Sequence, residues 1–168
     1  MDESATPVTK AELLRRLAAG YAAVGAVLAG LGDADLARPG VAGGWSAQDL
    51  LAHFIAHEQR ALEEQRHARR GARLAIDHGA NDAFNDGAVL AWRGATPAQV
   101  RAAWAASFGQ VVAAVEGLAE ADFDPAGPVA AALDDTIDGA LANNTYGHYA
   151  EHLPQLLTLR DRPAPTAP

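Results

Sequence analysis

The strongest constraint on the fold is the helical spacing of apolar residues in four long segments. In the first segment, over about residues 10–31, apolar side chains recur every three or four positions: Leu13, Leu14, Leu17, Tyr21, Val24, Leu28 and Leu31. Comparable stripes follow over about residues 46–70, 96–117 and 136–159. Such spacing places the apolar side chains on one face of an α-helix, and no segment alternates as a half-buried strand does. We therefore expect an all-α protein.

Helix start signals support these segments. Thr9 and Glu12 form a capping box, in which the hydroxyl accepts a backbone N–H and the carboxylate reaches back. Ser46 is expected to cap the second long helix. Thr96 followed by Pro97 is a favourable start for the third, because proline fits the first helical position.

Four long helices and no internal repeat predict a four-helix bundle. A short extra helix is expected between helices two and three, at about residues 81–92, and residues 119–135 are expected to form a loop with short turns. A chain of 168 residues is enough for one domain with one substantial core. We expect residues 1–168 to form that single domain, with loose tails at 1–8 and 161–168.

Charge and composition limit the classes of partner and the cellular location that we expect for this protein. The net charge of −8 argues against nucleic acid as a partner, because phosphate binding needs a basic face. The basic end of the second helix is explained more simply by the helix dipole. No apolar run approaches the ~18 residues of a membrane span, and the first residues do not resemble a secretory signal. We expect a cytoplasmic protein that does not bind membranes.

Cysteine is absent from the chain. Its absence excludes disulfides, thiolate metal ligands and a protein thiol nucleophile. Any metal site must use nitrogen and oxygen ligands, and any thiol chemistry must use an external thiol.

Two pairs of histidines are the candidate functional residues. His148 and His152 are four positions apart, and His53 and His57 repeat this spacing in another predicted helix. Residues four apart lie one turn apart on one helix face, where both imidazoles can reach one ion. One such pair also occurs by chance on solvated helices, but a second pair strengthens the prediction of a metal site.

Two stretches resemble the DinB/YfiT-like superfamily. They are Gly44–His53, which reads GWSAQDLLAH and is followed by Glu58, and Tyr146–Leu153, which reads YGHYAEHL. The segment Asn81–Asn85 (NDAFN) is also similar. The resemblance implies a four-helix bundle that holds one divalent ion with three histidines. By position these metal ligands are His53, His148 and His152.

The resemblance also implies a function. Relatives include transferases and isomerases that use mycothiol, bacillithiol or glutathione. The expected activity is therefore a metal-dependent transfer of an external low-molecular-weight thiol to a small electrophilic substrate. A non-catalytic metal- or small-ligand-binding stress-response protein and a metal-hydroxide hydrolase remain alternatives, so catalysis itself is open. Zinc and nickel are the favoured ions, although copper and iron also suit imidazole. For the oligomeric state, a homodimer remains an alternative to a monomer.

Neighbouring residues have several interpretations. His57 could be a fourth ligand, a proton shuttle or an exposed residue, and ranks below the other three histidines. Glu58 lies about 140° from His53 around the helix axis, so it is expected to support the site or form an ion pair. Glu151 is a candidate base on proximity alone.

Three further polar residues have ordinary explanations. Asn144 lies one turn before His148 and could line a pocket or bridge two helices. His67 and His78 are expected at the surface.

Overall fold

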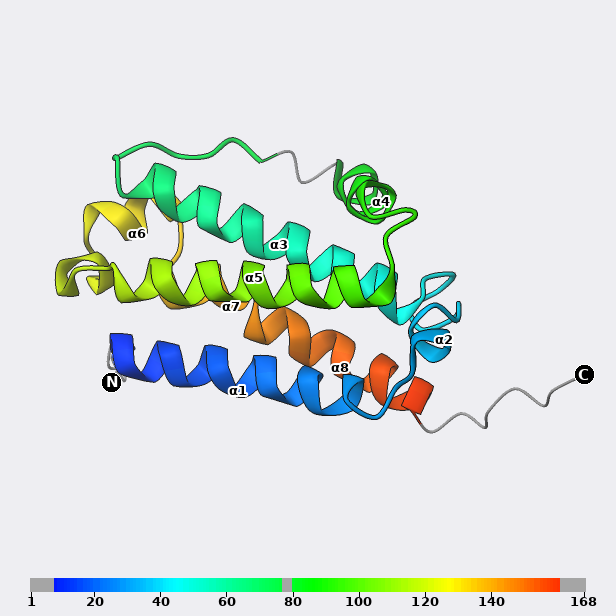
Figure 1. The fold of residues 1–168 in the computed structure, drawn as a ribbon. Coiled ribbons are helices and arrows are strands. Elements are labelled where there is room, and N and C mark those ends of the chain that lie inside the picture. Colours follow the sequence, from blue (N-terminus) through cyan, green and yellow to red (C-terminus); the bar gives the residue numbers. More distant parts are fainter. Residues whose placement is uncertain (1–7, 77–79, 161–168) are drawn as a thin grey trace, which may run out of the picture.

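Four long helices lie side by side as a bundle in the computed structural model, which describes residues 8–76 and 80–160 (Figure 1). They are α1 (Lys10–Leu28), α3 (Ala47–Ala68), α5 (Pro97–Glu116) and α8 (Tyr146–Arg160). Helix α3 packs along α5, and α1 packs along both α8 and α5. Helices α3 and α5 run in one direction, and α1 and α8 run in the opposite direction (Figure 1). The described residues form no β-strand, and the all-α bundle is confirmed.

The predicted helix starts are confirmed, but the Glu12 carboxylate pairs with Arg15 and Arg16 and does not complete the predicted capping box with Thr9. Each N-cap side chain accepts a hydrogen bond from the backbone N–H three residues further on: Thr9 from Glu12, Ser46 from Asp49 and Thr96 from Gln99. These bonds satisfy N–H groups that have no partner inside the helix. Within the described part of the chain, no helix is both long enough and apolar enough to cross a bilayer.

Shorter elements fill the connections. The predicted extra helix is α4 (Asn81–Ala91), which packs on α3. Helix α2 (Asp33–Leu36) lies in the first connection, where no helix was predicted. The predicted loop at 119–135 contains the 3₁₀ helix η2 (Glu120–Phe123) and α6 (Pro128–Leu133).

The prediction of one continuous last helix is wrong. The structure divides it into α7 (Ile137–Ala142) and α8, with a turn at 143–145. Two side chains in this turn hydrogen-bond to backbone carbonyls of α7: Asn144 Nδ2 donates to Ala140 O at 3.1 Å, and Thr145 Oγ1 donates to Leu141 O. Polar side chains that bond the backbone in this way compete with a regular helix.

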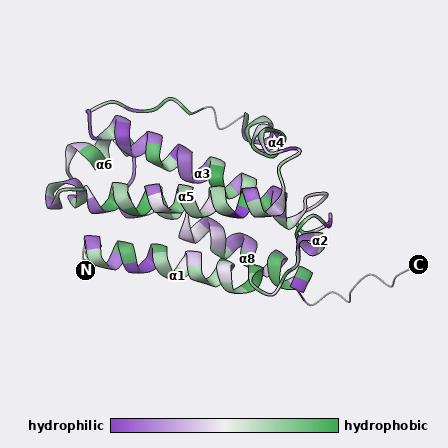
Figure 2. Ribbon diagram, viewed as in Figure 1, coloured by the Kyte–Doolittle hydropathy of each residue, from purple (hydrophilic) through white to green (hydrophobic). Residues whose placement is uncertain are grey.

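Two clusters of buried apolar side chains form the core. One surrounds Phe54, Trp104 and Tyr149 between α3, α5 and α8. The other joins Leu13 and Leu17 of α1 to the apolar residues of α5 and α7. Figure 2 shows that each long helix carries both hydrophobic and hydrophilic residues, as expected of helices with one face in a core.

Close packing of α1 on α8 depends on one glycine. A Cβ atom built at Gly20 would lie 2.6 Å from the Cβ atom of Tyr146, the first residue of α8. Only glycine allows the two backbones to approach this closely. The predicted tails at 1–8 and 161–168 lie outside the described residues except for Val8, and so does His78.

Candidate metal centre

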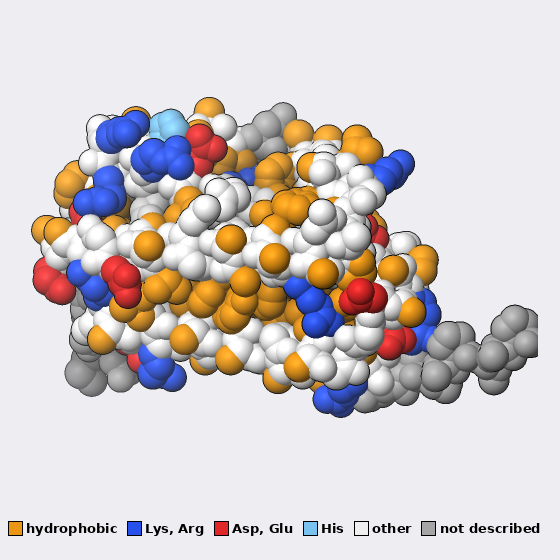
Figure 3. All heavy atoms as spheres, in the orientation of Figure 1, with side chains coloured by type: hydrophobic (Ala, Val, Ile, Leu, Met, Phe, Trp, Pro, Cys, Tyr) orange, Lys and Arg blue, Asp and Glu red, His pale blue; other side chains and the backbone are white. Residues whose placement is uncertain are grey.

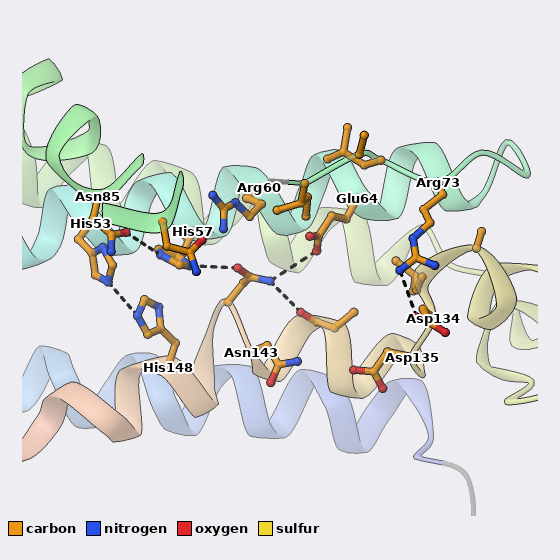
Figure 4. Close-up of a pocket in the computed structure, with 18 of the residues that line it drawn as sticks. His53, His57, Arg60, Glu64, Arg73, Asn85, Asp134, Asp135, Asn143 and His148 are labelled. Atoms are coloured by element: carbon orange, nitrogen blue, oxygen red, sulfur yellow. Dashed lines mark hydrogen bonds and ion pairs between the residues drawn. The ribbon is translucent and has the colours of Figure 1, made fainter. Parts of the chain in front are cut away.

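The two histidine pairs meet where α3 faces α8. His53 Nε2 lies 2.9 Å from His148 Nε2, and His152 Nε2 lies 3.1 Å from the same atom. The His57 ring centre lies 4.2 Å from that of His148 and 4.4 Å from that of His53. Figure 4 shows His53, His57 and His148 pointing toward one another across the gap between the two helices. The structure therefore brings together all four histidines that the sequence singled out.

The contacts at His148 Nε2 are those expected where ring nitrogens surround a shared cation. A ring nitrogen carries either one proton or one lone pair, so it makes one ordinary hydrogen bond in the ring plane. His148 Nε2 faces two other Nε2 atoms at once. Imidazole binds zinc at ~2.0–2.1 Å, which places two ligand nitrogens of a tetrahedral site ~3.3 Å apart. The separations of 2.9 and 3.1 Å from His148 Nε2 are close to this value, so these nitrogens fit a divalent ion.

Burial keeps the central imidazoles neutral. His53 is 3% exposed and His148 is 7% exposed. Burial is the main cause that lowers the pKa of His53 to about 3 and that of His148 to about 2, and the neighbouring histidines add to the effect. At neutral pH each ring therefore keeps a lone pair, which a metal ligand needs.

Different contacts orient the individual rings. His152 Nδ1 lies 2.7 Å from Gln155 Oε1, the kind of outer contact that fixes the orientation of a ligand histidine. The Nδ1 atoms of His53 and His148 are buried and have no hydrogen-bond partner among the described residues. Aromatic packing positions these two rings instead, for example Trp45 against His53 with ring centres 5.1 Å apart.

His57 belongs to the same cluster. Ligand nitrogens of His53, His57 and His148 all lie within 4.8 Å of one another, so this group, which contains His57 and not the predicted His152, could hold a metal ion. Asn144 Nδ2 donates to the Ala140 carbonyl, which leaves Asn144 Oδ1 to accept from His57 Nδ1 at 3.0 Å. Burial lowers the pKa of His57, and its Nε2 lies 3.4 Å from Asn85 Oδ1. Asn144 thus lines the cavity and bridges two elements.

Glu58 lies in the core rather than in the cavity. Its side chain is completely buried and accepts hydrogen bonds from Trp104 Nε1 at 2.9 Å and from the Tyr149 hydroxyl. Burial raises the pKa of Glu58 to about 7. Glu58 is therefore a structural carboxyl group that ties α3 to α5 and α8.

Glu151 and His67 lie away from the cluster. Glu151 is exposed on α8 and does not line the cavity beside the histidines. His67 Nδ1 lies 2.8 Å from the Glu63 carbonyl on the outer part of α3. Neither residue is placed to act on a ligand at the four histidines.

A cavity of about 980 Å³ opens from the histidine cluster along α3. Such a volume is typical of sites for small molecules. Arg60 and Glu64 line its middle, and its far end includes Arg73 and Asp134, whose side chains pair at 3.1 Å (Figure 4). Sequence reasoning missed Arg60. The available signal was its spacing of seven residues from His53, which puts both on one face of a helix.

One solved structure has the same fold. The crystal structure of the colibactin self-resistance protein ClbS in complex with a dsDNA matches with a TM-score of 0.79 and 14% sequence identity. The match covers 95% of this chain and 100% of that chain. A comparison with curated protein sequences gave no match.

The ClbS complex overturns one expectation. Nucleic acid was excluded as a partner on the net charge, but a protein of this fold has been crystallised with dsDNA, so that exclusion is wrong. The charge of −8 is a sum over the whole chain, whereas phosphate contacts depend on the charge of one face. The end of α3 exposes Arg66, Arg69 and Arg70 together.

A family model identifies the relatives of this chain. The model described as "Mycothiol maleylpyruvate isomerase N-terminal domain" matches residues 9–149, a stretch that includes His53, His57 and His148. This family lies within the DinB/YfiT-like superfamily that the sequence motifs resemble. The chain belongs to the family of mycothiol maleylpyruvate isomerase N-terminal domains.

Proposed function

We propose that the protein is a metal-dependent enzyme that transfers an external low-molecular-weight thiol to a small electrophile, or uses that thiol to isomerise it. His53, His148 and His152 would hold one divalent ion, with zinc and nickel favoured. The proposal rests mainly on the position of His148 Nε2, which lies 2.9 Å from His53 Nε2 and 3.1 Å from His152 Nε2 at the inner end of a cavity. The family description, which names a mycothiol-dependent isomerase, supports the thiol.

The chain supplies what such a site needs. Three neutral imidazoles leave the charge of an ion uncompensated and leave coordination positions open to the cavity. A bound divalent ion would lower the pKa of a thiol or water molecule at an open position. The thiol must come from outside, because the chain has no cysteine.

His57 is the proposed proton acceptor. Its Nδ1 lies 3.0 Å from Asn144 Oδ1 and its Nε2 lies 3.4 Å from Asn85 Oδ1, so an incoming thiol that displaces Asn85 would give its proton to Nε2. Burial lowers the pKa of His57, so the ring is neutral and able to accept a proton at neutral pH. Its place beside His53 and His148 puts it near any thiol bound there.

Cobalt substitution tests the proposal, because the visible spectrum of Co²⁺ changes with its coordination. Protein without a histidine tag should bind about one Co²⁺ per chain, and mercaptoethanol should shift the spectrum. His152→Ala should lose the metal, whereas His67→Ala, a change of histidine outside the cavity, should keep it. A spectrum that no low-molecular-weight thiol shifts would remove the transferase function. A metal-hydroxide hydrolase or a metal-binding stress-response protein would then remain.

A second candidate function is binding of duplex nucleic acid. Figure 3 shows basic side chains gathered beside a histidine over the end of α3. Arg66, Arg69 and Arg70 are exposed there, although Arg66 pairs with Glu63 at 3.6 Å and Arg69 with Asp122 at 3.3 Å. Exposed pairs of this kind are weak and can exchange for phosphate contacts. The ClbS complex with dsDNA favours this candidate.

Fluorescence anisotropy with a labelled duplex tests this candidate. Replacing Arg66, Arg69 and Arg70 with alanine should weaken binding and reduce its salt dependence. Arg15→Ala is the control, since Arg15 is exposed on α1 and pairs with Glu12. Equal weakening by both changes would point to a general charge effect and reject this surface.

A further inference from the structure

Arg60 shares one helix face with the histidines. His53, His57, Arg60 and Glu64 follow one another on α3 at intervals of four, three and four residues, so their side chains leave the helix on one side. All of them line the same cavity. Figure 4 shows Arg60 on α3 between His57 and Glu64. The cavity thus places a cationic side chain one turn beyond the histidine cluster.

An aromatic ring holds the guanidinium in place. Arg60 Cζ lies 3.5 Å from the centre of the Phe84 ring, which α4 supplies. No carboxylate of residues 8–76 or 80–160 forms an ion pair with Arg60 within 4.0 Å. Stacking on a ring uses the face of a guanidinium and leaves the N–H groups at its edge free to donate. Arg60 is therefore an oriented donor that faces a cavity.

We propose that Arg60 anchors a carboxylate group of the ligand that binds at the histidine cluster. This inference rests on the proposed function: the family description names maleylpyruvate, a carboxylate, and the inference assigns the residue that would hold such a group. The guanidinium edge matches a carboxylate with two parallel hydrogen bonds.

The local charge favours a carboxylate over a phosphate. Glu64 lies one turn beyond Arg60 in the same cavity wall. Arg73 and Asp134 pair with each other at the far end. Away from the ion that the histidines would hold, the wall therefore offers one positive charge close to one negative charge, and a phosphate dianion at Arg60 would bring its second charge close to Glu64.

The carboxylate could belong to the thiol or to the electrophile, and two sets of probes separate these sources. Mercaptoethanol has no carboxylate, whereas thioglycolate, mercaptopropionate and mercaptobutyrate carry one at increasing distance from the sulfur. Their dissociation constants are measured on the cobalt-loaded protein from its spectrum. Crotonate, an electrophile with a carboxylate, and neutral crotonamide are titrated by calorimetry with and without mercaptoethanol.

The test compares Arg60→Met with Arg15→Met, a change of an exposed arginine on α1. In the unmodified protein and Arg15→Met, one mercaptocarboxylate or crotonate should bind roughly tenfold more tightly than its neutral analogue, as a charge-assisted hydrogen bond allows. Arg60→Met should abolish that preference and keep the metal content. Glu64→Gln should strengthen carboxylate binding, because it removes the nearby negative charge.

Each outcome decides between the two proposals. A preference for mercaptocarboxylates that is lost in Arg60→Met assigns the carboxylate to the thiol, and one for crotonate assigns it to the electrophile. A preference that persists in Arg60→Met, or no preference in the unmodified protein, overturns the role of Arg60. If no thiol shifts the spectrum, the proposed function fails, and the crotonate titration still decides on Arg60. Phe84→Leu keeps the charge but removes the stacking, so it should lose part of the preference.

Discussion

His53 Nε2 lies 2.9 Å from His148 Nε2, although 95 positions separate the two residues in the chain. The contact joins α3 to α8, so it exists only in the folded bundle. A ligand that binds both rings therefore binds the native state and not the unfolded chain. Metal binding and folding should be coupled, and the first predictions follow from this coupling.

His148→Ala should lose most of the bound metal. The change removes the nitrogen that faces both His53 and His152. His57→Ala should keep most of the metal, because His57 is assigned to proton transfer. Elemental analysis of protein without a histidine tag gives the metal content of both variants. Equal loss in both would make His57 a fourth ligand and indicate a closed, structural site.

Removing the metal with a chelator should lower the melting temperature without abolishing the helices. A ligand at one hundred times its dissociation constant stabilises the native state by ~2.7 kcal/mol. The apolar clusters that hold the bundle together do not depend on the metal. Circular dichroism with increasing metal should show a rising melting temperature and a nearly constant helix signal. Complete unfolding in chelator at room temperature would contradict this prediction.

The metal-free protein should lose stability as the pH falls below about 6.5. Folding lowers the pKa of His53 to about 3 and that of His148 to about 2, mainly by burial, whereas both rings in the unfolded chain titrate near 6.5. Between these values the unfolded chain binds more protons, so acid favours unfolding. Urea denaturation across this pH range measures the slope of the free energy of unfolding against pH. His148→Gln should flatten it and His67→Gln should not; equal slopes in all three proteins would reject this explanation.

Glu58 should produce a pH dependence of opposite sign. Burial raises its pKa from 4.5 to about 7, so the native state holds the proton to a higher pH than the unfolded chain does. The stability that Glu58 contributes is fully present below about pH 4.5 and is lost as the pH rises through about 7. Across this pH range the contribution of Glu58 to the free energy of unfolding changes by on the order of 3 kcal/mol.

Glu58→Gln should therefore reduce the loss of stability between about pH 5 and pH 8. Glutamine keeps an oxygen that can accept from Trp104 and Tyr149, so the variant should still fold. Glu63→Gln, on the exposed side of the same helix, is the matched control and should leave the slope unchanged. Urea denaturation at the two ends of this pH range is the measurement. An unchanged slope in Glu58→Gln would show that Glu58 titrates alike in both states.

Replacing either of two glycines of α1 with alanine should change the stability of the protein, but in opposite directions. In Gly20→Ala the new Cβ would lie 2.6 Å from the Cβ atom of Tyr146, so the variant should lose ~1–3 kcal/mol of stability by overpacking. A Cβ at Gly25 would meet no atom within 4 Å, so Gly25→Ala should gain up to ~1 kcal/mol from helix propensity. Chemical denaturation of both variants measures this. A gain in both would show that α8 can move away from α1 at little cost.

The sequence predicted those parts of the fold that depend on local chemistry. Capping side chains such as Ser46 satisfy N–H groups a few residues away, so their signal lies within one short segment. The histidine pairs were found for the same reason, because four-residue spacing implies one face of a helix. These signals sufficed for α1, α3 and α5 and for the histidines that the structure brings together.

The rest depended on contacts between distant segments. Arg60 gains its orientation from Phe84 of α4, and Glu58 becomes a core residue only when Trp104 and Tyr149 surround it. The division between α7 and α8 was missed because Asn144 and Thr145 are compatible with a helix as well as with a turn. The charge argument failed because composition does not report how arginines are distributed over the surface.

The turn at 143–145 affects which substitutions the sequence can accept without disturbing the histidine cluster. In an unbroken helix every residue fixes the direction of the next by about 100°, so repacking one end rotates the side chains at the other. Here Ile137 and Leu141 of α7 belong to one apolar cluster, whereas Tyr149 and Leu156 of α8 belong to the other. Because the turn separates the two helices, α7 can exchange its apolar residues over generations while His148 keeps its direction toward His53.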